Sequence, residues 1–158
     1  MSCDNLFMKT KYIITFVLFF CLSACQPATP PPPFDATVGE SFTLAPGGMA
    51  HITDAGYSVT LISVGNDERC PANIECAVSG PVAVSISIQK DASTPAQFDM
   101  QTFTSEDGMV PKFAFEGIRS EVEYEGYTIG IVSVLPYPQE FNEKITPKDY
   151  RVTFVVLK

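Results

Sequence analysis

The sequence predicts an all-β fold: an antiparallel β-sandwich of about eight or nine short strands, immunoglobulin-like or partly closed into a barrel. Between residues 34 and 158, apolar and polar side chains alternate with a period of two over most of the chain. Clusters of Gly, Pro, Asp and Ser separate the alternating stretches. No segment has the 3.6-residue period of a convincing amphipathic helix, and 139–148 has room for one helical turn at most.

The expected strands follow from this alternation. Residues 81–88 place branched apolar side chains on one face and Ala or Ser on the other, which predicts one buried face. Residues 150–157 are apolar on both faces near their end, which predicts a central strand. Further strands are expected at 41–44, 49–53, 57–65, 97–104, 112–117, 121–125 and 127–135.

The N-terminus has the layout of a secretory signal. Lys9 and Lys11 precede the apolar run 12–22, which is well short of the ~20 residues that a membrane-spanning helix needs. Residues 1–24 are therefore expected to form a signal peptide. Translation is expected to begin at Met8, because the stretch that starts there is a more ordinary signal than the one that starts at Met1.

The sequence Leu-Ser-Ala-Cys that ends at Cys25 resembles the lipobox of bacterial lipoproteins. The resemblance implies cleavage before Cys25, a lipid on its thiol and membrane attachment in the bacterial cell envelope. Gln26 follows the cysteine, and in such lipoproteins a residue other than Asp implies transfer to the outer membrane if the host has two membranes. Residues 25–33, with four consecutive prolines, are expected to form a stalk about 25 Å long in the polyproline II conformation. Residues 34–158 are expected to form a single β domain.

The charge balance limits the partners. The chain has 10 Lys and Arg against 18 Asp and Glu, and a net charge of −8. An acidic surface repels phosphate backbones, so nucleic-acid binding is not expected. The same charge disfavours docking on anionic headgroups, so the lipid on Cys25 is expected to be the membrane partner.

Compartment also determines what the cysteines do. Cys3 and Cys21 lie in the predicted signal and Cys25 carries the lipid, which leaves Cys70 and Cys76 in an oxidising envelope. One pair there is most simply one disulfide. The chain-entropy model gives such a short ring about 2.4 kcal/mol of stabilisation.

The cysteine ring has two interpretations. Pro71 and Asn73 favour a rigid turn, so the ring is either a staple between strands or a loop that grips a partner. A rigid loop of this kind is also the form of a protease-inhibitor wedge. Asp67 and Arg69 are expected to brace the loop by hydrogen-bonding its backbone, or else to contact the partner.

Catalytic and metal chemistry finds little support. His51 is the one histidine, and no nucleophile elbow accompanies it. A zinc site would require reduced cysteines beside His51. Carboxylates leave calcium open, although 66–68 and 105–108 lack EF-hand spacing. A carboxylate pair acting on an envelope polymer stays open too, but the chain has no Trp on which sugars stack. We therefore expect no enzyme and no cofactor.

The stretch 63–88 resembles the signature of a family of bacterial secreted proteins and lipoproteins, Asp-Ser-Arg-Cys-Pro, a cysteine five residues on, then Trp and Gly. The matching residues are Asp67, Arg69, Cys70, Pro71, Cys76 and Gly80, and the segments 126–138 and 148–158 resemble the family's second half. The resemblance implies an all-β extracytoplasmic domain. Glu68 replaces the usual Ser, and Val78 stands where the family has Trp, as a ligand platform or as a core plug.

Taken together, the sequence predicts a lipid-anchored, non-enzymatic module of the cell envelope that binds an envelope protein or polymer through its loops. The first alternative is a protease inhibitor that uses the loop from Cys70 to Cys76. The second is an enzyme acting on envelope polymers, for which no residue constellation is visible.

Overall fold

A computed structural model describes residues 31–158 except for 114 and 142. The predicted signal peptide, Cys25 and most of the predicted stalk lie outside the described residues. The strands are β1 (Phe34–Ala36), β2 (Ser41–Leu44), β3 (Met49–Ile52), β4 (Tyr57–Asp67), β5 (Val82–Lys90), β6 (Ala96–Thr102), β7 (Glu121–Tyr124), β8 (Tyr127–Leu135) and β9 (Arg151–Leu157). One short 3₁₀ helix, η2 (Pro147–Asp149), precedes β9.

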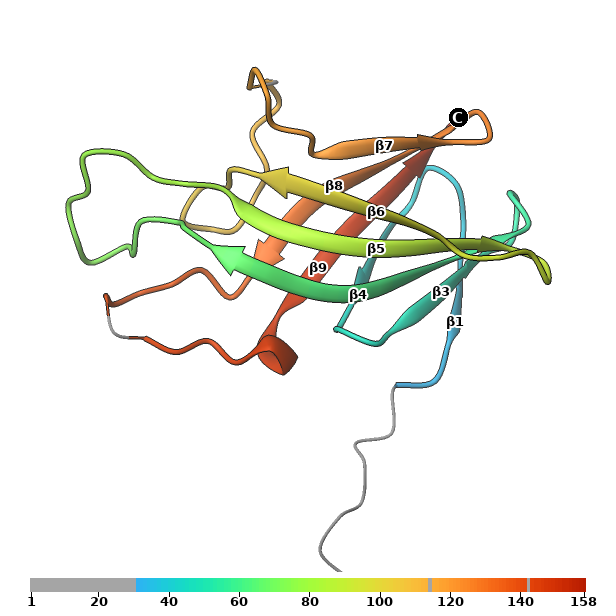
Figure 1. The fold of residues 1–158 in the computed structure, drawn as a ribbon, viewed down its shortest axis with the longest axis horizontal. Coiled ribbons are helices and arrows are strands. Elements are labelled where there is room, and N and C mark those ends of the chain that lie inside the picture. Colours follow the sequence, from blue (N-terminus) through green and yellow to red (C-terminus); the bar gives the residue numbers. More distant parts are fainter. Residues whose placement is uncertain (1–30, 114, 142) are drawn as a thin grey trace, which may run out of the picture.

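The strands form two facing sheets, which confirms the predicted all-β sandwich (Figure 1). One sheet has the strand order β1-β3-β4-β5-β6 and the other the order β2-β9-β8-β7. Every pairing is antiparallel except that of β1 with β3, which is parallel. The exception arises because the chain crosses from β1 to β2 in the other sheet before it returns as β3, so no hairpin sets the direction of β1.

The core lies between the two sheets and follows the predicted alternation. In β5, Val82, Val84, Ile86 and Ile88 are fully buried, while the residues between them face outward. Each such side chain contributes about 1.5–3 kcal/mol relative to an exposed position. The last strand, β9, lies between β2 and β8, which confirms the prediction of a central strand.

The expected strand at 112–117 is wrong. The described residues of this segment, 112–113 and 115–117, contain bends and a turn, and Phe113 and Phe115 are exposed. The alternation there is real but serves a surface stack instead of a sheet face, because the rings of Phe103, Phe115 and Phe113 pack on one another with centroids 4.4 and 4.9 Å apart. Conversely, β1 is a short strand that the alternation did not indicate.

The two ends of the sandwich differ in their connections (Figure 1). One end carries the long loops 68–81, 103–120 and 136–150, and we call it the long-loop end. The opposite end carries the short turns 53–56, 91–95 and 125–126, and we call it the tight-turn end. The predicted site residues of the cysteine loop therefore lie at the long-loop end, beside the connection from β8 to β9.

Candidate functional site

Arg69 is the centre of the long-loop end. Its side chain has no exposed surface, and all five of its N–H donors point at acceptors. Nε and one Nη2 proton bind the two carboxylate oxygens of Asp67, at 2.8 and 2.6 Å. The remaining donors bind Thr104 Oγ1 at 3.2 Å, the Val134 carbonyl at 2.9 Å and the Pro136 carbonyl at 2.8 Å. This one side chain therefore connects the loop 68–81 to the loop 103–120, to the end of β8 and to the loop 136–150.

Asp67, the last residue of β4, is the acidic partner of Arg69 in this network. Besides the Arg69 guanidinium, it accepts a hydrogen bond from the Arg69 backbone N–H at 3.2 Å and one from the Tyr150 hydroxyl at 2.9 Å. Burial, together with the bond to this carboxylate, raises the pKa of Tyr150 to about 12. The start of β9 is therefore tied to the end of β4 in the other sheet.

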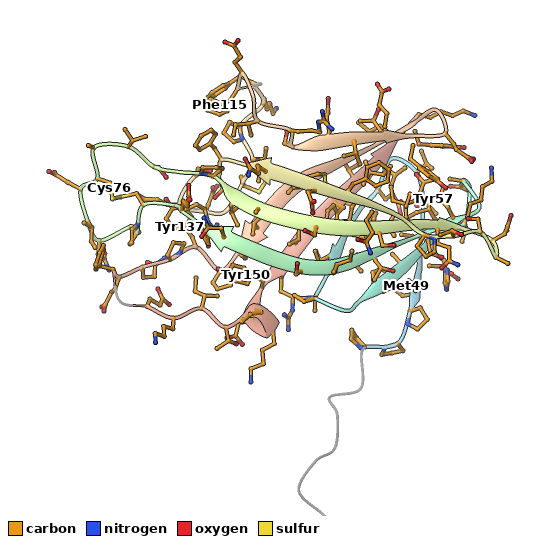
Figure 2. The ribbon with its side chains drawn as sticks, viewed as in Figure 1. Met49, Tyr57, Cys76, Phe115, Tyr137 and Tyr150 are labelled. Carbon is orange, nitrogen blue, oxygen red and sulfur yellow. A yellow bond between two sulfur atoms is a disulfide. The ribbon has the colours of Figure 1, made fainter. Side chains whose placement is uncertain are left out.

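Tyr137 links this network to the disulfide ring. Its ring lies under the guanidinium of Arg69, with the Cζ atom 4.9 Å from the ring centroid. Its hydroxyl donates to the Cys70 carbonyl at 2.7 Å. Figure 2 shows Tyr137 and Tyr150 within the long-loop end, with Cys76 on the loop beyond them and Tyr57 at the opposite end. The disulfide ring is therefore anchored at Cys70 to the buried side chain of Tyr137.

The predicted disulfide between Cys70 and Cys76 is confirmed. The predicted turn residues Pro71 and Asn73 lie inside its ring, where the Asn73 N–H donates to the Gln139 carbonyl at 3.1 Å. The neighbouring Ala72 N–H donates to the Pro138 carbonyl at 3.0 Å, so the ring pairs with the loop 136–150 through two backbone bonds.

Gly80 closes the stem of the cysteine loop. Its N–H donates to the Glu68 carbonyl at 2.9 Å. A Cβ at position 80 would clash with the Glu68 Cβ and would lie 2.8 Å from that carbonyl oxygen. The stem therefore requires glycine here, which gives one member of the sequence signature a structural reason.

The two paired loops expose large apolar side chains. Val78 is 83% exposed and Phe141 is 80% exposed, while Ile74 in the disulfide ring is 38% exposed. Position 78 therefore does not plug the core in this chain. The side chain that stands where the resembled family has Trp points to solvent.

A groove of about 770 Å³ runs between the base of the cysteine loop and the loop 136–150. We call it the ring groove; its lining is Gly65, Asn66, Asp67, Glu68, Arg69, Pro71, Pro138, Glu140, Phe141, Glu143, Lys144, Ile145, Thr146, Pro147 and Tyr150. Its inner wall is formed by the braced residues of the Arg69 network and by prolines. Its outer rim carries charged side chains and Phe141.

The residues considered for chemistry do not converge. No group of three or more His, Cys, Asp or Glu side chains is placed to hold a metal within the described ranges 31–113, 115–141 and 143–158. His51 is exposed on β3, where its Nδ1 shares a hydrogen bond of 2.8 Å with the Ser58 hydroxyl of β4. No helix among the residues that the structure describes has the length and apolar character needed to span a membrane.

The chain matches no protein-family model, no curated protein and no solved structure. Sequence reasoning missed Thr104, Tyr137 and Tyr150, which complete the Arg69 network. The one signal that could have indicated the tyrosines is their position at the two ends of a Pro-rich loop between strong strands.

Proposed function

We propose that the protein is a lipid-anchored, non-enzymatic module of the bacterial cell envelope that binds an envelope protein or polymer with its long-loop end. The observation that carries the proposal is the exposure of Val78 and Phe141, at 83% and 80%, on loops that are fixed at their bases. Val78 and Phe141 lie on two loops that are paired through backbone hydrogen bonds, and apolar side chains gathered on neighbouring loops, unlike ones scattered singly, mark an interaction surface. A loop that is already ordered loses little entropy on binding, which favours affinity.

The polar groups of this end support a binding role over a catalytic one. Every N–H donor of Arg69 is occupied by an acceptor of the protein itself, and Asp67 accepts from Arg69 and Tyr150. The Arg69 guanidinium therefore has no N–H left to donate to a substrate. These two residues support the loops that carry the exposed side chains.

The inhibitor alternative has less support. A wedge that enters a protease cleft needs extended backbone with free hydrogen-bonding groups along it. In this ring Ala72 and Asn73 form a turn, and their N–H groups are already bound to the loop 136–150. A panel of serine and cysteine proteases assayed with and without the protein would detect inhibition directly, and inhibition lost in a Cys76→Ser variant would favour this alternative.

The binding surface can be tested by site-specific photocrosslinking in intact cells. A photoreactive amino acid at position 78 or 141 is expected to give a discrete adduct, because these side chains would touch the partner. The same amino acid at Thr94, which is exposed in the tight turn between β5 and β6, is the matched control and is expected to give none. Adducts from position 94 but not from 78 or 141 would contradict the proposal.

The anchor requires a separate test, because the lipid attaches outside the described residues. Cells fed a clickable palmitate analogue are expected to label the full chain and not a Cys25→Ser variant. The variant should then leave the membrane fraction, since Cys25 is the proposed attachment point. Equal labelling of both proteins, or membrane retention of both, would overturn the proposed lipid anchor. The proposal that the long-loop end binds a partner would be unaffected.

A further inference from the structure

We infer that the ring groove docks a lysine- or arginine-containing segment of a partner protein, with the cationic groups on its rim and the aliphatic parts on its floor. The inference rests on the proposed function and names the chemistry of the partner. It follows from two properties of the groove: its apolar floor and its acidic rim.

The floor of the groove is apolar and rigid. Pro138 and Tyr150 are buried there, Ile145 is half-buried, and Pro71 closes the side formed by the disulfide ring. Prolines and the braced Tyr150 have few conformations to lose when a ligand covers them. At the rim, Phe141 is 80% exposed and is placed to cover an apolar stem. Such a floor suits the aliphatic stems of Lys and Arg, which pack on apolar surfaces while their charged ends reach the rim.

The rim is acidic. Three exposed carboxylates face the groove, from Glu68, Glu140 and Glu143, against the one ammonium of Lys144. Asp67 and Arg69 also line it, but they neutralise each other in an ion pair. The ion pairs among the described residues are Asp67 with Arg69 and Lys90 with Glu125, so none of the three rim carboxylates has a cationic partner there. Charge complementarity therefore selects a basic occupant.

The other occupants fit less well. A second copy of this chain would bring a net charge of −8 to an acidic rim. An anionic lipid or nucleic acid would meet the same repulsion. A basic peptide segment satisfies both the floor and the rim.

The full chain, purified in a neutral detergent, can be titrated into a fluorescein-labelled peptide of sequence Lys-Leu-Lys-Pro-Lys while fluorescence anisotropy is followed. Binding is expected, and the matched peptide Glu-Leu-Glu-Pro-Glu should not bind. Replacing Leu by Ser in the basic peptide should weaken binding, because the floor is apolar. Equal anisotropy changes with the basic and acidic peptides, or none with either, would overturn the inference.

Two triple variants separate the groove from the overall charge of the molecule. E68Q/E140Q/E143Q removes three charges from the rim and is expected to weaken binding of the basic peptide by about tenfold or more. Because Glu143 accepts a bond from the Gln139 N–H, glutamine keeps an acceptor there, and the melting temperature verifies folding. E116Q/E121Q/E123Q removes the same charge from the 103–120 loop and β7, and is expected to change binding less than twofold. Equal weakening of peptide binding by both variants would show that the peptide responds to the net charge of the protein and not to the groove, and would overturn the inference.

The peptide-binding test of the groove and the photocrosslinking test of the proposed function can fail independently. Photocrosslinks from positions 78 and 141, together with failure of the basic peptide, would remove the groove inference alone. Failure of the crosslinks would remove the proposed function, whatever the peptide does.

Discussion

The two ends of the sandwich hold their polar groups in opposite ways. At the long-loop end the ion pair of Asp67 and Arg69 is buried, and Arg69 also donates hydrogen bonds to Thr104, Val134 and Pro136. At the tight-turn end the ion pair of Lys90 and Glu125 is exposed, and short turns need no such support. Backbone groups at the bases of long loops need partners, and here one buried arginine donates to two backbone carbonyls, those of Val134 and Pro136. The buried ion pair therefore lies at the end whose long loops need internal support, and the exposed pair at the end whose turns are short.

The largest expected effect comes from removing the buried cation. Arg69→Met leaves the Asp67 carboxylate without its cationic partner and the Val134 and Pro136 carbonyls without the guanidinium that donates to them, so the free energy of unfolding should fall by about 3–5 kcal/mol. Urea denaturation followed by circular dichroism measures it. The control at the other end is Lys90→Met, which breaks an exposed pair and should leave the urea midpoint nearly unchanged. Similar losses in both variants would erase the contrast between the ends.

The disulfide is expected to matter less than the arginine. Replacing Cys70 and Cys76 by Ser should lower the free energy of unfolding by about 2 kcal/mol, because the ring is short and its backbone bonds to Pro138 and Gln139 persist. The same denaturation experiment compares the double variant with the oxidised protein. A loss larger than that of Arg69→Met would mean that the ring, and not the arginine, holds the loop.

The two ends also make opposite predictions for two buried tyrosines. Tyr150→Phe removes the hydroxyl that donates to Asp67 and should cost about 1.5 kcal/mol or more. Tyr57, at the tight-turn end, is 3% exposed and its hydroxyl has no hydrogen-bond partner among the described residues, so Tyr57→Phe should stabilise by up to about 1 kcal/mol. Thermal unfolding of the two variants measures whether each substitution raises or lowers the melting temperature. A change in the same direction for both variants would contradict the prediction that one hydroxyl stabilises the fold and the other does not.

A further expected effect is a dependence of the stability on alkaline pH. Burial raises the pKa of Tyr57 to about 12, and burial with the Asp67 bond does the same for Tyr150, whereas an unfolded tyrosine titrates near 10. Above pH 10 the unfolded chain loses these protons while the folded chain keeps them, so stability falls as pH rises from 10 to 12. Each Phe variant should flatten this decline between pH 10 and 12. An unchanged decline in both variants would show that these tyrosines do not cause it.

Much of the fold could be predicted because it depends on local patterns. The alternation in 81–88 and the apolar run in 150–157 correctly predicted a one-sided strand and a central strand. The disulfide followed from eliminating the other cysteines. The strand expected at 112–117 was wrong because alternation does not distinguish a sheet face from a surface aromatic stack.

The site could be predicted only in part. Asp67 and Arg69 are two residues apart, so their pairing is visible in the sequence as a local possibility. Thr104 and Tyr150 reach the pair from 35 and 83 residues away, and no periodicity signals such contacts. The exposure of Val78 was equally hidden, because a valine after a cysteine suits a core position just as well.

The Arg69 network is expected to hold the cysteine loop rigid, so that its exposed side chains are displayed in fixed positions. Hydrogen exchange of single amides tests this most directly. In the wild-type protein the Ala72 and Asn73 amides, bonded to the carbonyls of Pro138 and Gln139, should be protected to nearly the same degree as those in β5. In Arg69→Met, under conditions where β5 stays protected, these two amides should exchange much faster. Rapid exchange of both amides in the wild type, or equal protection in the variant, would contradict the account.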